Sequence, residues 1–136
     1  MLDPKNVEMK IKDDAKTIMT KKIKPGQVVL LALNDGSNGY SKLGGTCTIG
    51  ANFQLVALDH KDPEFSIPVK NNAGFDMYTS DKELAFLDAG LVLNARNATL
   101  ALSDNEGIVD GAVSIEEFKG NKLTKEEMEK LGGKIC

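Results

Sequence analysis

Residues 28–58 read VVLLALNDGSNGYSKLGGTCTIGANFQLVAL, two apolar runs of six residues on either side of a glycine-rich segment. The run 28–33 shows no polar alternation, which is typical of a strand buried on both faces, and 53–58 is expected to be a second central strand. Five of the chain's 13 glycines fall between Gly36 and Gly50, a density that predicts a loop shaped to hold a ligand. Cys47 ends this loop, and its thiol is a candidate soft metal ligand or nucleophile.

Short strands and few helices are expected on both sides of these runs. The alternation from Val7 to Ile11 indicates a strand, after which Asp13 caps a helix that ends at Pro25. Residues Ser80–Glu83 form a capping box that opens a short interior helix ending near Gly90. The remaining strands are expected around 67–70 and 75–78, at 91–94 and 99–102 around a turn at 95–97, and at 108–109 and 112–115.

The chain from Lys119 onward has a different composition. Residues 124–127 form a second capping box, which predicts a charged C-terminal helix with few apolar contacts. We therefore divide the chain into a domain over 1–118 and a charged helical tail over 119–136. Many short strands with few helices predict a mainly β domain, a distorted barrel.

The bulk properties indicate a soluble, cytoplasmic domain. The chain has 136 residues, 41% of them hydrophobic and 27% charged, which fits one globular domain. A net charge of −3 gives no basic footprint for nucleic acid or an anionic membrane. No apolar run is long enough to span a bilayer, and no signal peptide is visible. Two cysteines 89 positions apart do not make a disulfide framework, so a reducing compartment is expected.

Cys47, Cys136 and His60 are the soft metal donors that the chain offers. A zinc or iron–sulfur site needs three or four such donors, so a site at Cys47 would need ligands from a second subunit. Cys136 is either an exposed terminal thiol without a site role or a second thiolate that reaches Cys47. His60 is either a solvated turn residue or the base of a Cys47–His60 pair in a thiol-dependent enzyme. The plain alternative for Cys47 is a small buried residue at the start of a strand.

Two other kinds of site do not fit the spacing. The glycine segment matches neither phosphate-binding motif, and a strand follows it where those motifs require a helix. Residues 106–117 place a glycine and a final glutamate as an EF-hand does. However, Glu106 opens the segment where aspartate is expected and Ile108 occupies a ligand position. We therefore expect neither nucleotide nor calcium binding.

The segment from Leu33 to Asp59 resembles the HesB/IscA-like family of iron–sulfur cluster biosynthesis proteins, in a divergent branch from lactic-acid bacteria. The resemblance spans roughly residues 7–118 and implies a pseudobarrel of mixed sheets with an N-terminal, a short interior and a C-terminal helix. In the family, a Gly-Gly-x-Cys-like element and a later Cys-x-Cys pair hold iron or a cluster, usually across subunits. The residues that carry the resemblance are Leu33–Gly36, Tyr40–Cys47 and Phe53–Asp59, with support from Ile11–Ala15 and Leu84–Gly90.

Cys47 matches the first of these ligand positions, but residues 103–111, which correspond to the Cys-x-Cys pair, contain no cysteine. Carboxylates such as Asp104 or Asp110 are poor substitutes for thiolates in iron–sulfur ligation. The resemblance implies a non-enzymatic scaffold or carrier of the A type, a homodimer whose partners are iron–sulfur assembly or acceptor proteins. Iron or an iron–sulfur cluster is the implied cofactor, with Cys47 and, where it reaches the site, Cys136 as metal ligands.

An alternative reading keeps the same fold but removes the cluster. In that reading the protein binds a small ligand or a protein partner through the Gly36–Cys47 loop. The missing Cys-x-Cys pair is the feature of the sequence that favours this alternative.

Overall fold

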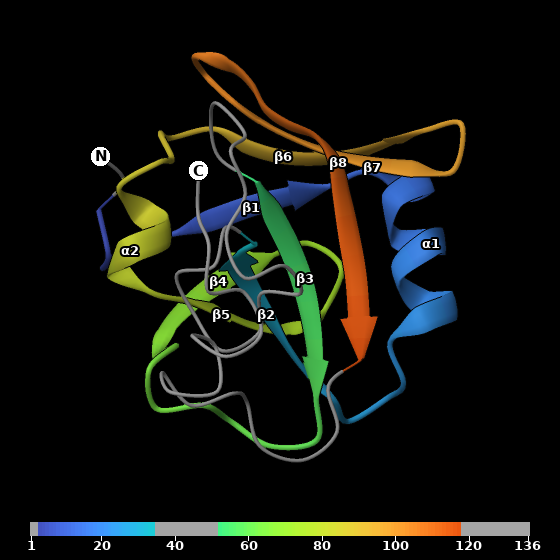
Figure 1. Ribbon diagram of the computed structural model, residues 1–136, viewed down its shortest axis with the longest axis horizontal. Helices are drawn as coiled ribbons and strands as arrows, with labels where there is room; N and C mark the ends of the chain where they lie inside the picture. Colours follow the sequence, from blue (N-terminus) through green and yellow to red (C-terminus); the bar gives the residue numbers. More distant parts are fainter. Residues whose placement is uncertain (1–2, 35–51, 118–136) are drawn as a thin grey trace, which may run out of the picture.

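The computed structural model of the chain describes residues 3–34 and 52–117. In these residues eight strands form one closed barrel, and two helices lie beside it (Figure 1). Around the barrel the strands follow the order β1-β4-β5-β2-β3-β8-β7-β6. The mainly β barrel predicted from the sequence is confirmed. The elements are β1 (Glu8–Ile11), α1 (Asp13–Lys22), β2 (Val28–Leu33), β3 (Phe53–Leu58), β4 (Ile67–Asn71), β5 (Asp76–Thr79), α2 (Asp81–Leu84), β6 (Leu91–Arg96), β7 (Thr99–Asp104) and β8 (Gly107–Glu117).

Parallel and antiparallel strand pairs alternate irregularly around the barrel. β2 and β3 pair antiparallel along their whole length, from Val28 opposite Leu58 to Leu33 opposite Phe53. The pairs β4–β5, β6–β7 and β7–β8 are also antiparallel. Parallel pairs join β1 to both β4 and β6, β2 to β5, and β3 to β8. The sheet is therefore mixed, as the resemblance implies.

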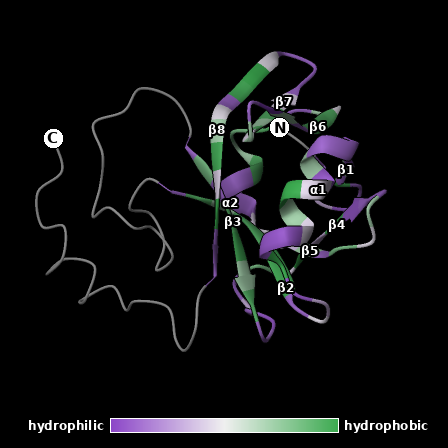
Figure 2. Ribbon diagram, turned by 90° about the vertical axis from the view of Figure 1, so that its right-hand side faces the viewer, coloured by the Kyte–Doolittle hydropathy of each residue, from purple (hydrophilic) through white to green (hydrophobic). Residues whose placement is uncertain are grey.

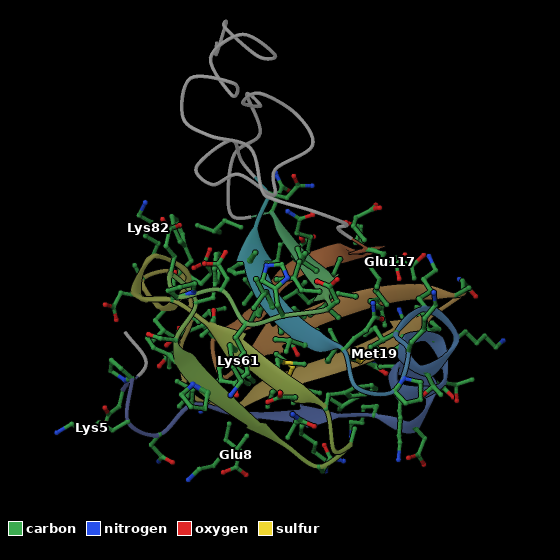
Figure 3. All side chains as sticks on the ribbon, turned by 90° about the horizontal axis from the view of Figure 1, so that it is seen from below. Lys5, Glu8, Met19, Lys61, Lys82 and Glu117 are labelled. Atoms are coloured by element: carbon green, nitrogen blue, oxygen red, sulfur yellow. The ribbon has the colours of Figure 1, made fainter. Side chains whose placement is uncertain are left out.

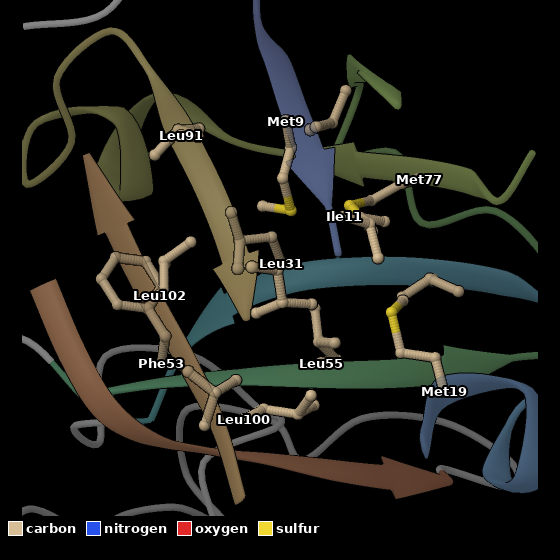
Figure 4. Packing of buried hydrophobic residues seen from close by; sticks show 14 of the residues in the cluster. Met9, Ile11, Met19, Leu31, Phe53, Leu55, Met77, Leu91, Leu100 and Leu102 are labelled. Carbon is tan, nitrogen blue, oxygen red and sulfur yellow. The ribbon is translucent and has the colours of Figure 1, made fainter. Parts of the chain in front are cut away.

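β2 and β3 are buried on both faces, which explains why their sequences do not alternate. Successive side chains of a strand point to opposite faces, so the two runs supply two separate hydrophobic clusters. One set points into the barrel among residues of all the other strands (Figure 4). The other set packs on the outer face with Phe65 and Tyr78. The inward set is Val29, Leu31, Leu33, Phe53, Leu55 and Ala57, and the outward set is Val28, Leu30, Ala32, Val56 and Leu58.

α1 packs against β6 and β8 and buries Ala15 and Met19 in the barrel core. Its outward turns are hydrophilic, whereas β2 and β3 are hydrophobic (Figure 2). Met19 points inward, while charged residues such as Lys5 and Glu8 project from the periphery (Figure 3). The predicted cap is wrong by one residue, because Lys12 is the N-cap and makes no side-chain capping bond. Asp13 lies in the first turn instead, where its negative charge is favourable beside the helix dipole.

Three boundaries differ from those expected. α2 ends at Leu84 rather than near Gly90, and the Ser80 hydroxyl bonds the Glu83 carboxylate rather than the helix backbone. β6 continues through Arg96, two residues beyond the expected end, so the turn to β7 consists of residues 97 and 98 rather than 95–97. Residues 107–117 form one strand rather than two, because β7 pairs with the first part of β8 and β3 with the second. A continuous strand here is not the helix-flanked loop of an EF-hand.

The turn between β6 and β7 contains a strained alanine. Asn97 and Ala98 have φ values of 52° and 63°. Two adjacent positive φ values are typical of a type I′ hairpin, in which asparagine and glycine are tolerated and alanine is not. We expect Ala98→Gly to raise the free energy of unfolding by about 0.5–1 kcal/mol, since relief of this strain exceeds the added entropy of the unfolded chain. Urea denaturation checks this value.

The matched control is Ala101→Gly, in the middle of β7. Glycine weakens a strand interior, so this variant is expected to be less stable by roughly 0.5–1 kcal/mol. Equal loss of stability in both variants would show that the positive φ at Ala98 carries no strain.

The predicted C-terminal helix and the tail 119–136 lie outside the described residues, so the division of the chain at residue 118 stays a prediction. The described helices have ten and four residues, and neither has the length or apolarity to cross a membrane.

Candidate functional site

The two ends of the Cys47-bearing segment meet at one end of the β2–β3 pair. The Asn34 N–H donates to the Asn52 carbonyl at 2.7 Å, one step beyond the pairing of Leu33 with Phe53. The chain therefore leaves and rejoins the barrel at a single neck, formed by residues 33–34 and 52–53. Cys47 and Cys136, the two predicted metal ligands, both lie outside the described residues.

A buried carboxylate holds the β2 side of this neck. Glu83 is 1% exposed, and its Oε2 accepts a hydrogen bond from the Leu33 N–H at 2.9 Å. The parallel pairing of β2 with β5 stops at Leu30, so the backbone of the last β2 residues needs other partners on that side. The buried Thr79 hydroxyl donates to the Leu31 carbonyl at 2.8 Å, and Glu83 serves Leu33. Beyond the point where the β2–β5 backbone pairing ends, the side chains of Thr79 and Glu83 bond the backbone of β2.

A second carboxylate holds the β3 side. Asp110 Oδ2 accepts from the Phe53 N–H at 2.7 Å, and its Oδ1 accepts from the Ala112 N–H at 2.9 Å. The parallel pairing of β3 with β8 begins at Gln54, so the Phe53 N–H lies just beyond that ladder. Glu83 and Asp110 therefore fix the two strand ends between which the Cys47 segment runs.

Neither anchor is predicted from the sequence. Glu83 belongs there to the capping-box pattern of residues 80–83, and Asp110 to the rejected EF-hand segment and to the carboxylates that are poor substitutes for thiolates. Glu83 follows the polar residues Ser80, Asp81 and Lys82, so no pattern in the sequence marks it as buried. No local pattern predicts the bond between Asp110 and Phe53, because the two residues are 57 positions apart.

The β7–β8 hairpin, which the resemblance places at the Cys-x-Cys region, uses Asp104 and Asp110 for backbone contacts. Asp104 Oδ2 accepts from the Asp88 N–H at 2.9 Å, and its Oδ1 accepts from the Glu106 N–H at 2.8 Å. Asp104 and Asp110 thus hold the backbone in place. Among residues 3–34 and 52–117, no three His, Cys, Asp or Glu side chains are grouped so as to hold a metal ion.

His60 lies away from the neck. It follows the opposite end of β3 from Phe53, and a strand of six residues spans about 20 Å. Its Nδ1 is 2.6 Å from Asp59 Oδ1, and both side chains are exposed. This hydrogen bond lowers the pKa of the Asp59 carboxyl. His60 therefore pairs with the exposed Asp59, at the opposite end of β3 from the neck.

A family comparison covers both the neck and the hairpin. The model of the protein family described as iron–sulphur cluster biosynthesis matches residues 7–117. The chain belongs to this family. The resemblance inferred from the residues around Cys47 is thereby confirmed. A comparison with curated proteins gives no match.

Two solved structures are similar to this iron–sulphur cluster biosynthesis protein. A candidate Fe–S biosynthesis protein from Lactobacillus acidophilus is 26% identical, with 82% of this chain and 90% of that chain covered and a TM-score of 0.69. A candidate Fe–S biosynthesis protein from Lactobacillus salivarius, described as having a novel fold, is 22% identical, with 84% and 100% covered and a TM-score of 0.67. The second likeness concerns the fold alone.

Proposed function

We propose that this protein is a non-enzymatic scaffold or carrier of the A type, which takes iron or an iron–sulfur cluster on Cys47. The observation that carries the proposal is the neck. The family's cysteine position lies in a segment whose two ends are fixed on one side by Glu83 and on the other by Asp110. Fixed ends at the neck supply in advance the loop closure that a site on this segment requires.

The remaining ligands are proposed to come from outside the described barrel. A cluster needs three or four soft donors, and thiolates suit iron–sulfur chemistry better than carboxylates. Asp104 and Asp110 each already accept two backbone N–H groups. Cys136, the Cys47 of a second subunit in a homodimer, or a cysteine of an assembly or acceptor protein would complete the site. The cytoplasm is the proposed compartment, since it keeps such thiols reduced.

Anaerobic reconstitution with ferrous iron and sulfide tests the proposal. We expect the wild-type protein to develop visible sulfur-to-iron charge-transfer absorption, and Cys47→Ser to lose it because serine is a poor soft ligand. Thr48→Ser is the matched control, a conservative change in the same segment that keeps the thiol. Cys136→Ser decides whether the terminal thiol takes part. Identical absorption in wild type and Cys47→Ser would overturn the role of Cys47.

The alternative is the same fold without a cluster, which binds a small ligand or a protein through the Gly36–Cys47 loop. The observation that favours it is the use of both hairpin carboxylates for backbone contacts in a region without cysteine. Absence of charge-transfer absorption and of bound iron in the wild-type protein would favour this alternative.

A further inference from the structure

A groove between the segment after α2 and the β7–β8 hairpin gathers exposed apolar side chains. Among the described residues, two large hydrophobic side chains are exposed, Phe86 at 52% and Ile108 at 77%. Both line the same groove, which has a volume of about 370 Å³. Single exposed hydrophobic residues are ordinary on a surface, but two that share one hollow indicate a binding surface.

The walls of the groove are fixed to each other by one backbone hydrogen bond and by one bond to a side-chain carboxylate. The Asn105 N–H donates to the Ala89 carbonyl at 3.0 Å, and the Asp88 N–H donates to Asp104 Oδ2 at 2.9 Å. These bonds tie the tip of the hairpin to the chain that follows α2. The groove is therefore formed before anything binds, which reduces the ordering cost of binding.

The rim of the groove carries one sign of charge. Three of its lining residues are acidic, namely Asp88, Asp104 and Glu106, and none of the described lining residues is basic. A partner that fills the groove with an apolar side chain would gain further from cationic groups beside it. A second copy of this chain, bound by the same face, would instead bring two acidic rims together.

We propose that this groove docks a cationic segment of a partner protein, in which lysine or arginine residues flank one or two apolar anchor side chains. The anchors contact Phe86 and Ile108, and the cationic groups face the three carboxylates. Val109 in the groove immediately precedes Asp110, which holds the Phe53 N–H at the neck. A partner docked here therefore contacts the start of β8, the strand whose Asp110 holds the first residue of β3. The proposal does not depend on cluster binding. Docking in the groove can therefore be measured on the protein with or without iron.

The test uses the full chain and a fluorescently labelled synthetic peptide of leucine and lysine at helical spacing. The control peptide has glutamate in place of lysine. We expect the lysine peptide to bind, to shift the amide resonances of residues 85–88 and 104–109, and to bind more weakly as ionic strength rises from about 0.05 to 0.5 M. Equal binding of the glutamate peptide, or amide shifts that map elsewhere, would overturn the proposal.

Two surface variants locate the interaction. Ile108→Ser and Glu106→Lys change exposed side chains, so both variants should stay folded, and each is expected to weaken binding of the lysine peptide by about tenfold. Glu8→Lys, an exposed charge reversal on β1, is the matched control and should leave binding unchanged. An unchanged dissociation constant in both groove variants would show that the groove is not the site.

Two further outcomes would name a different occupant and so overturn the proposal. If Ile108→Ser converts a dimer to a monomer in sedimentation, the groove is the contact between copies. If the lysine peptide binds about tenfold more tightly to the chain truncated after residue 118, the protein's own tail fills the groove. Unchanged sedimentation and unchanged affinity in the truncated chain support a partner protein.

Discussion

Phe53→Ala is expected to lower the free energy of unfolding by about 3–5 kcal/mol, the range for loss of a buried phenylalanine. Phe53 is 1% exposed, points into the barrel core and is the first residue of β3. Its removal leaves a cavity among side chains of several strands, which the closed barrel cannot collapse to fill. Urea denaturation followed by circular dichroism measures the change, and we expect a fall of roughly 10–20 °C in Tm.

The chain offers a matched control in Phe86, which is 52% exposed. Phe86→Ala deletes the same side chain from a surface position and should change stability by no more than about 0.5 kcal/mol. Phe53→Leu keeps most of the buried volume and should cost under about 1.5 kcal/mol. A loss in Phe53→Ala no larger than that in Phe86→Ala would contradict the placement of Phe53 in the core.

Glu83→Ala is expected to cost about 3 kcal/mol, since it leaves the buried Leu33 N–H without its acceptor and removes the partner of the Ser80 hydroxyl. Glu83→Gln keeps an acceptor oxygen at the same place and should cost only about 1 kcal/mol. Denaturation measures both. Amide hydrogen exchange gives a local readout, in which Leu33 exchanges faster in Glu83→Ala by more than the global loss of stability explains.

The control for this variant is Glu106→Ala, which removes an exposed carboxylate from the β7–β8 hairpin. Its stability should match wild type to within about 0.5 kcal/mol. If Glu83→Ala and Glu106→Ala behaved alike, and Leu33 kept its protection, the carboxylate of Glu83 would not be what holds the end of β2.

Much of the barrel could be predicted from local patterns. The run 28–33 is apolar throughout and 53–58 is apolar except for Gln54, and both lack the polar alternation of a strand with one solvated face. The strands near residues 8, 67, 76, 91 and 99 also follow from alternation and turn signals. The continuity of β8 could not be predicted, because it depends on two different neighbouring strands whose positions a single segment does not encode.

The candidate site was predictable in part. The family follows from the resemblance carried by Leu33–Gly36, Tyr40–Cys47 and Phe53–Asp59, and the family model confirms it. The site role of Cys47, at the end of the glycine-rich segment, stays a prediction. The anchors at the neck depend on contacts across 50 and 57 positions, between Glu83 and Leu33 and between Asp110 and Phe53. Periodicity in the sequence does not predict such contacts. They arise where one strand extends beyond the end of its neighbour, and a side chain then bonds the backbone group that the neighbour would otherwise have bonded.

The strand order has a consequence for when the protein can fold during synthesis. β1 leaves the ribosome before its partners β4 and β6. Met9 therefore cannot pair until Asn71 and Leu91 have been synthesised. β8, the last strand within residues 52–117, closes the barrel between β3 and β7. Contacts of such large sequence separation form slowly. The neck is incomplete until Asp110 has left the ribosome, so the two ends of the Cys47 segment become fixed only after the start of β8 has been synthesised.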